Sequence, residues 1–147
     1  MAQHPRRGSF STGLTDLLVL DSEGVSKAAS KDPSVHAWLE RARELDADVV
    51  VSAVTLAELV RGVAPDAGVD RVVKAADVRP AGEQLARRAG RLLGRAGSHA
   101  TIDALVAATA LTVRERNGSA QCVVLTSDPG DLAALVSEES GVRVVPV

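Results

Sequence analysis

Short runs of consecutive apolar residues alternate along the chain with longer segments whose apolar residues recur at helical spacing. The predicted strands cover residues 17–20, 48–51, 122–125 and 142–145, which are apolar apart from Asp48 and Arg143, and Val78 marks a brief further strand. A run that is apolar on both faces is typical of a strand inside a parallel sheet. We therefore interpret residues 17–20 as a central strand of a parallel sheet and the other segments as its further strands.

The segments between the strands carry the residues that begin and end helices. Asp32-Pro33 is a typical helix start, and Asn117-Gly118 is a typical helix end. The predicted helices cover residues 23–29, 32–45, 55–62, 69–76, 81–96, 101–116 and 128–136. Strands and helices alternate throughout, which predicts an α/β fold with three layers, α/β/α, and a mainly parallel sheet.

The composition narrows the class of protein. The 147 residues, 46% of them hydrophobic, suffice for one domain with a substantial core. Residues 1–15 are polar and without periodicity, so we expect a flexible N-terminal arm followed by a domain over residues 16–147. Only Phe10 and Trp38 are aromatic. Reading of single-stranded nucleic acid by stacking on aromatic side chains is therefore disfavoured.

Charge and cysteine content point to an intracellular protein that does not coat nucleic acid. The net charge of −2 excludes a generally basic surface. Cys122 is the single cysteine and cannot form an internal disulfide. We recognise neither a signal peptide nor an apolar segment of membrane-spanning length. These features favour a cytoplasmic location.

Acidic residues stand where the predicted strands end and the helices begin. They are Asp21, Glu58, Asp103 and Asp128. Each can be explained as a helix cap, and Thr55-x-x-Glu58 has the form of a capping box. Capping does not compete with clustering, however, because helix starts that follow parallel strands lie at one edge of the sheet. Clustered carboxylates are usually neutralised by a hard divalent cation.

Four sequence blocks resemble the PIN-domain family, and in particular the toxin ribonucleases of VapBC toxin–antitoxin pairs. The blocks are residues 19–22, 55–59, 102–110 and 125–128, in the family's order and spacing. The resemblance implies about five parallel strands and a Mg²⁺- or Mn²⁺-dependent endoribonuclease that leaves 5′-phosphate and 3′-hydroxyl ends. It also implies an RNA substrate, a VapB-type antitoxin as partner, and a homodimer.

The resemblance also assigns individual residues. By position, Asp21, Glu58, Asp103 and Asp128 match the family's acidic metal site, Thr126 its neighbouring hydroxyl, and Asp131 a further acidic position. Ser22-Glu23-Gly24 departs from the usual pattern and adds a carboxylate, Glu23, which is either an extra ligand or turned away. Magnesium suits such a site because it prefers oxygen ligands and retains several waters.

A row of arginines lies outside these blocks. Arg87, Arg91 and Arg95 are spaced at i, i+4 and i+8, which places them along one side of a predicted helix. Contact with RNA phosphates, an ordinary solvated face and an antitoxin-binding surface all remain open for this row. His99 and Asp103 are also four apart, but no second His or Cys stands nearby to complete a zinc site.

Two other functions compete with the nuclease. One is a non-catalytic PIN-like module that binds RNA or protein, for which loss of an acidic residue would be the sign; all four are present. The other is an α/β domain phosphorylated on aspartate. Phosphatases of that kind carry a second Asp two residues after the first and a later Lys. Here Glu23 stands at that position, and the lysines are only Lys27, Lys31 and Lys74.

Overall fold

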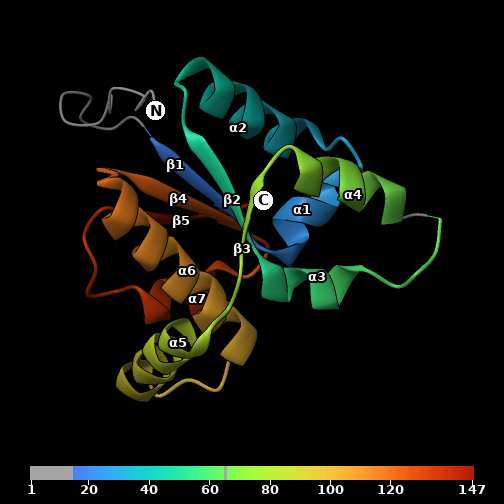
Figure 1. The fold of residues 1–147 in the computed structure, drawn as a ribbon. Coiled ribbons are helices and arrows are strands. Elements are labelled where there is room, and N and C mark those ends of the chain that lie inside the picture. The colour runs from blue at the N-terminus through green and yellow to red at the C-terminus, as the bar shows by residue number, and fades with distance from the viewer. Residues whose placement is uncertain (1–14, 65) are drawn as a thin grey trace.

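A computed structural model of the chain describes residues 15–64 and 66–147; within them the chain forms five strands and seven helices (Figure 1). The strands are β1 (Leu17–Leu20), β2 (Asp48–Ser52), β3 (Asp77–Arg79), β4 (Cys122–Thr126) and β5 (Val142–Pro146). The helices are α1 (Ser22–Ala29), α2 (Pro33–Glu44), α3 (Ala53–Leu59), α4 (Asp66–Lys74), α5 (Glu83–Ala96), α6 (Thr101–Asn117) and α7 (Pro129–Leu135).

The strands form one sheet in the order β3-β2-β1-β4-β5, and all neighbouring strands run parallel. The predicted fold class is thus confirmed. β1 lies in the middle, with Leu20 opposite Val51 of β2 and Leu125 of β4. All five strands therefore end at the same edge of the sheet, which we call the carboxyl edge.

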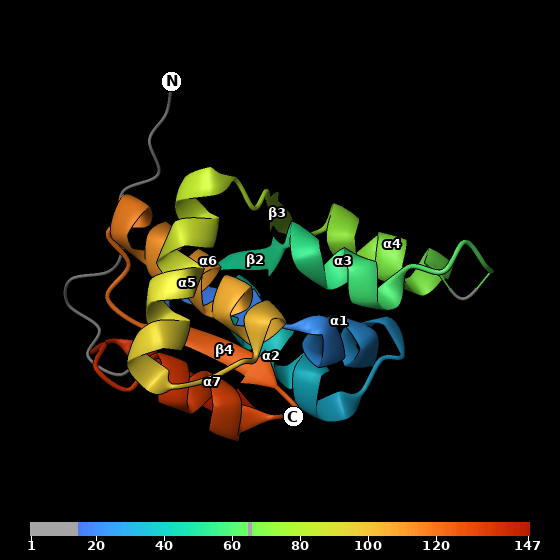
Figure 2. The same cartoon turned by 90° about the horizontal axis from the view of Figure 1, so that it is seen from below.

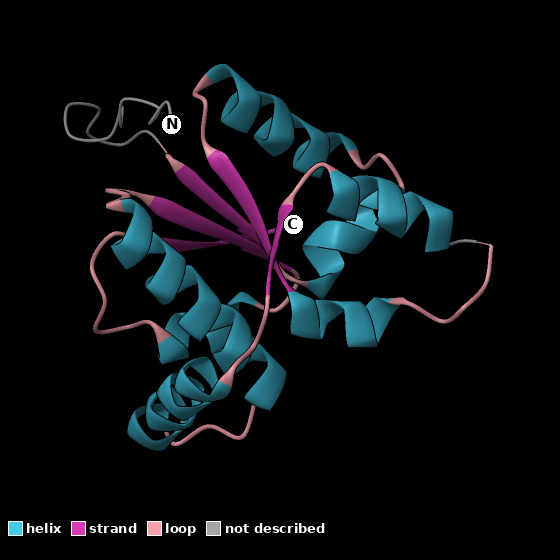
Figure 3. Cartoon of the chain, in the orientation of Figure 1, coloured by secondary structure: helices cyan, strands magenta, loops and turns pink. Residues whose placement is uncertain are grey.

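Helices cover both faces of the sheet, which gives the three predicted layers (Figures 1 and 3). Side chains of a strand point alternately to its two faces. Leu17 and Val19 of β1 accordingly pack in a core with α5, α6 and α7, whereas Leu18 and Leu20 pack in a second core with α1, α2 and α4. This double burial explains why β1 is apolar at every position.

The predicted helix boundaries agree with the structure to within a few residues, with one exception that concerns Glu58. We expected Thr55 to open the helix in a capping box. Instead Ser52 is the N-cap of α3 and accepts a hydrogen bond from the Val54 amide at 3.4 Å, while the Thr55 hydroxyl donates to the Ser52 carbonyl at 2.8 Å. The helix ends at Leu59 rather than at Gly62. The capping box was therefore wrong.

The N-terminal arm predicted over residues 1–15 lies, apart from Thr15, outside the described residues. In the part of the chain that the structure describes, every helix is too short or too polar to cross a membrane.

Candidate functional site

Asp21 follows β1 directly and lies almost buried, at 7% exposure. It is the N-cap of α1, where its carboxylate accepts a hydrogen bond from the Gly24 amide at 2.8 Å. A Cβ on Gly24 would meet the Leu125 carbonyl oxygen at 3.2 Å. Glycine here lets the first turn of α1 lie against β4, so the departure at Ser22-Glu23-Gly24 is compatible with a close-packed turn beside Asp21.

Thr126 connects two of the acidic residues. It is fully buried at the end of β4, one position beyond the pairing of Leu125 with Leu20. Its hydroxyl donates to Asp21 and accepts from the Asp128 amide at 3.0 Å. Burial raises the pKa of Asp21, and the hydrogen bonds from Thr126 and Gly24 partly offset that effect. The hydroxyl thus stabilises the charged form of a buried carboxyl.

Asp103, in the first turn of α6, shows that the acidic side chains are gathered. Its pKa is raised to about 6, first by burial and then by the negative charges of other carboxylates. Those carboxylates, in decreasing order of effect, are Asp131, Asp21, Asp128 and Glu58. A charge acts on a neighbour's pKa only over a short distance. The structure therefore brings all four predicted acids, and Asp131, to one region at the carboxyl edge.

The structure separates the two marginal acids. Asp131 has the largest effect of any charge on the pKa of Asp103. Glu23 acts instead on Asp21, with the smallest of the effects there, and is not among the charges that raise the pKa of Asp103. Asp131 is thus the better-placed fifth member of this group, which we call the acidic cluster: Asp21, Glu58, Asp103, Asp128 and Asp131.

Positions at helix starts explain only part of the acidic cluster. Asp21 does cap α1, and Asp103 lies in a first turn, where a negative charge suits the helix dipole. Asp128 occupies the N-cap position of α7, but its side chain makes no capping hydrogen bond. Glu58 lies in the last turn of α3, the unfavourable end for an anion. Two of the members therefore lack the stabilising role that was the main alternative.

The donor set of the acidic cluster suits a hard divalent cation, because every candidate ligand is a carboxylate oxygen. None of the ion pairs formed within residues 15–64 and 66–147 includes a member of the cluster. Nor do three or more His, Cys, Asp or Glu side chains of these residues already stand at coordinating positions. The carboxylates are close enough to repel one another, but they are not arranged at the distances of a formed metal-coordination site.

The arginine row lies on α5, which packs against α6 (Figure 2). Arg87 pairs with Glu83 at 3.0 Å, and Arg95 pairs with Glu138 of the segment after α7 at 3.0 Å. Arg91 lines a shallow hollow beside Arg88. Two of the three guanidinium groups are thus partly neutralised by neighbouring carboxylates, and a role in RNA binding stays a prediction.

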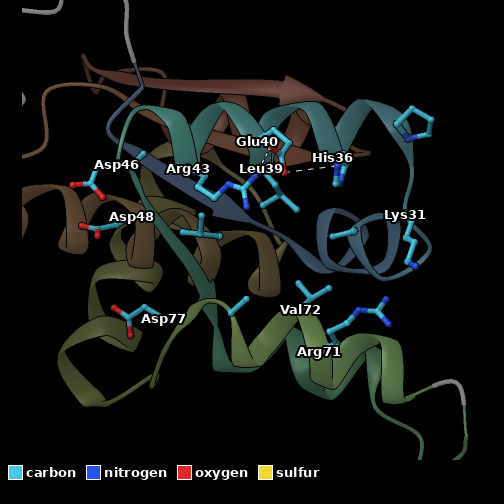
Figure 4. Close-up of a pocket in the computed structure, with 15 residues that line it drawn as sticks. Lys31, His36, Leu39, Glu40, Arg43, Asp46, Asp48, Arg71, Val72 and Asp77 are labelled. Carbon is cyan, nitrogen blue, oxygen red and sulfur yellow. Dashed lines mark hydrogen bonds and ion pairs between the residues drawn. The ribbon is translucent and has the colours of Figure 1, made fainter.

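A groove that the sequence did not reveal lies between α2 and α4 and has a volume of about 1080 Å³ (Figure 4). Its walls include apolar side chains such as Leu39 and Val72. Acidic residues stand at one end and basic ones at the other (Figure 4). The acidic end has Asp46, Asp48 and Asp77, and the basic end has Lys31, His36 and Arg71. No local motif could have indicated it, because its residues come from five separate segments of the chain.

Comparison with known proteins agrees with this architecture. Residues 18–135 match the family model described as the PIN domain. Among solved structures, the chain is similar to one in the crystal structure of VapBC2 from Rickettsia felis bound to a DNA fragment from their promoter. The TM-score is 0.66 at 15% identity, over 89% of this chain and 98% of that chain. No curated protein matches the sequence significantly. The family match covers most of the chain, and the chain therefore belongs to the PIN-domain family.

Proposed function

We propose that the protein is a Mg²⁺- or Mn²⁺-dependent endoribonuclease that acts as the toxin of a toxin–antitoxin pair. The observation that carries this proposal is the gathering of five carboxylates at the carboxyl edge, where burial and then the charges of the other four raise the pKa of Asp103. Repulsion of this kind costs stability, so its presence favours a functional role. Family membership and the likeness to a VapBC2 chain support the same reading.

The acidic cluster would hold the cation, with Asp21 and Asp103 as central ligands and Asp128, Glu58 and Asp131 around them. When bound, the cation supplies an activated water and offsets charge on the scissile phosphate. The chain's own contribution is positioning: Thr126 and Gly24 fix the Asp21 carboxylate through hydrogen bonds. The pKa of Asp103 is about 6, so without a cation its carboxyl group is protonated in part of the molecules near that pH. Cation binding would displace that proton.

Cleavage of RNA by the purified protein tests the proposal. The assay compares Mg²⁺, Mn²⁺ and EDTA, and pairs Asp103→Asn with Asp48→Asn, which removes a charge at the opposite end of the sheet. Cleavage that needs the cation and is lost only in Asp103→Asn supports the nuclease. Cation binding without cleavage of any RNA supports the non-catalytic PIN-like module. Equal cleavage by both variants would show that the activity lies elsewhere or in a contaminant.

We also propose that the groove between α2 and α4 receives a helical segment of an antitoxin. The groove combines an apolar wall with oppositely charged ends, so it suits an amphipathic helix with its basic end near Asp48 and its acidic end near Arg71. If a small open reading frame adjoins the gene, its co-expression with this chain, followed by pull-down, tests this pairing. Val72→Asp should abolish capture, whereas Arg87→Ala on α5 should leave it unchanged. The homodimer remains a prediction that light scattering can check.

A further inference from the structure

In the described part of the chain, Glu58, like Asp128 and Asp131, is not held in the acidic cluster by contacts of its own side chain. Its side chain is exposed, and within the described residues it takes part in no hydrogen bond or ion pair. Asp21, by contrast, is buried and hydrogen-bonded to Gly24. The last turn of α3 is therefore what places Glu58 beside the other acids, because it fixes the point from which the side chain extends.

Arg61 holds that turn by a hydrogen-bonded cap. Its guanidinium group donates to the carbonyl oxygens of Ala57 at 3.0 Å, Glu58 at 2.7 Å and Val60 at 2.9 Å. The last carbonyl groups of a helix have no partner within the helix. A cation at this end also interacts favourably with the helix dipole. Arg61 thus satisfies the Glu58 backbone directly.

Asp66 in turn holds the backbone of Arg61. Its carboxylate accepts hydrogen bonds from the amides of Arg61 at 3.1 Å, Gly62 at 2.6 Å and Val63 at 3.1 Å. Gly62 has a φ of 74°, a conformation that glycine adopts without strain. One carboxylate therefore fixes three successive residues of the segment that follows α3.

Asp66 is also the first residue of α4, and α4 is anchored to α1. Gly68 lets the two helices approach, since a Cβ there would lie 3.3 Å from the Ala29 side chain. Arg71 donates to the Ala29 carbonyl at 3.1 Å. Asp21 is the N-cap of α1, so a continuous series of contacts joins Asp21 to Glu58 through α1, α4, Asp66 and Arg61.

We propose that Arg61 and Asp66 are positioning residues that hold Glu58 in the acidic cluster and thereby set its affinity for a divalent cation. The inference rests on the proposed function as far as the cation is concerned. That Arg61 and Asp66 stabilise the end of α3 follows from the hydrogen bonds alone. Neither residue ligates the cation; both act through the backbone at Glu58.

Titration of the RNA-free protein with Mn²⁺, followed by electron paramagnetic resonance, tests the effect on affinity. Removing a residue that orients a metal ligand typically costs about 10- to 100-fold in affinity. We expect the lower end for Asp66→Ala and a smaller loss for Asp66→Asn, which keeps one acceptor oxygen. The matched control is Asp32→Ala, because Asp32 caps α2 in the same manner, accepting from the Ser34 and Val35 amides. It should leave Mn²⁺ binding unchanged.

A double-mutant cycle shows whether the effect passes through Glu58. Asp66→Ala should weaken Mn²⁺ binding in the wild-type background and cause no further loss in the Glu58→Gln background. Additive losses would mean that Asp66 acts by another route and would overturn the proposal. So would a wild-type affinity in Asp66→Ala.

Hydrogen exchange separates failure of this inference from failure of the proposed function. Asp66→Ala should speed amide exchange at Leu59, Val60 and Gly62 while the amide of Val25 in α1 keeps its protection. Unchanged exchange in α3 would overturn the claim that Asp66 and Arg61 stabilise the last turn of this helix. A wild-type protein that binds no Mn²⁺ would overturn the cation site and the effect on affinity, even if the exchange result is as expected.

Discussion

Aspartates lie at both ends of the sheet, and their side chains have different kinds of neighbour at the two ends. At the amino end, Asp16, Asp48 and Asp77 each have a partner of their own. The Asp16 carboxylate accepts from the amides of Ala120 and Gln121 at 2.9 and 3.0 Å. Asp48 accepts from the Asn117 side chain at 2.9 Å, and Asp77 pairs with Arg79 at 3.4 Å.

At the carboxyl edge the acids have one another as neighbours. Asp103 is surrounded by the charges of Asp131, Asp21, Asp128 and Glu58, which add to the effect of burial in raising its pKa. Asp21 alone has well-defined hydrogen bonds. The amino-end acids thus link strands and loops through hydrogen bonds and an ion pair, whereas repulsion within the acidic cluster lowers the stability of the fold. Residue type alone does not distinguish the two roles; the partners do.

The largest expected effect is on catalysis. Asp21→Asn or Asp103→Asn should lower Mg²⁺-dependent RNA cleavage by more than about 100-fold, because loss of a central ligand should exceed the effect of losing its supporting contacts. Asp48→Asn keeps its hydrogen bond from Asn117 and should change cleavage less than about twofold. Single-turnover assays measure both. Similar losses at the two ends would remove the functional distinction between them.

The reverse experiment concerns stability. Asp16→Ala should lower the free energy of unfolding by about 2 kcal/mol, because the partly buried amides of Ala120 and Gln121 lose a charged acceptor. Urea unfolding measures the change. Asp16→Asn keeps one acceptor and should lose less. A destabilisation by Asp21→Asn that equals the Asp16→Ala loss would show that both ends serve the fold alike.

The two marginal acids should differ in cation affinity. Asp131→Asn should weaken Mn²⁺ binding by roughly 10-fold, since Asp131 is the charge that acts most strongly on Asp103. Glu23→Gln should weaken it by less than about threefold. Calorimetric titration of both variants decides the matter, and a greater loss for Glu23→Gln would place the first turn of α1, rather than α7, at the cation.

The smallest effect is a gain in stability without metal. The raised pKa of Asp103 means that the folded protein holds this proton more tightly than the unfolded chain does. The associated stability is present below the ordinary pKa of 3.8 and is lost as pH rises to about 6. Asp103 is half-buried, and solvent screens part of the repulsion.

Asp103→Asn should therefore be more stable than wild type by about 1 kcal/mol at pH 8 with EDTA present. Near pH 4 the two proteins should unfold alike, because the wild-type carboxyl is then largely protonated. Urea unfolding at both pH values measures the difference. A variant that is less stable at pH 8 would mean that Asp103, like Asp16, supports the fold.

The sequence was sufficient for the strands, most helices and the family, because apolar runs and capping residues are local signals. It failed at Glu58, where Ser52 and Thr55 are both good caps three positions apart and packing selects the earlier one. It could not rank Glu23 against Asp131, since that depends on how α1 and α7 lie relative to α6. The Arg61–Asp66 contacts and the groove of Figure 4 likewise arise from segments that meet only in the folded chain.

The sheet order has a consequence for synthesis of the chain. β1 lies beside β4, so Thr126, Asp128 and Asp131 from the last quarter of the chain complete a site that Asp21 begins. While the ribosome is making the protein, β1, β2 and β3 emerge long before β4, the second neighbour of β1. A prematurely terminated chain would hold only part of the acidic cluster. The order of the strands thus makes translation as far as α7 a condition for assembling the site.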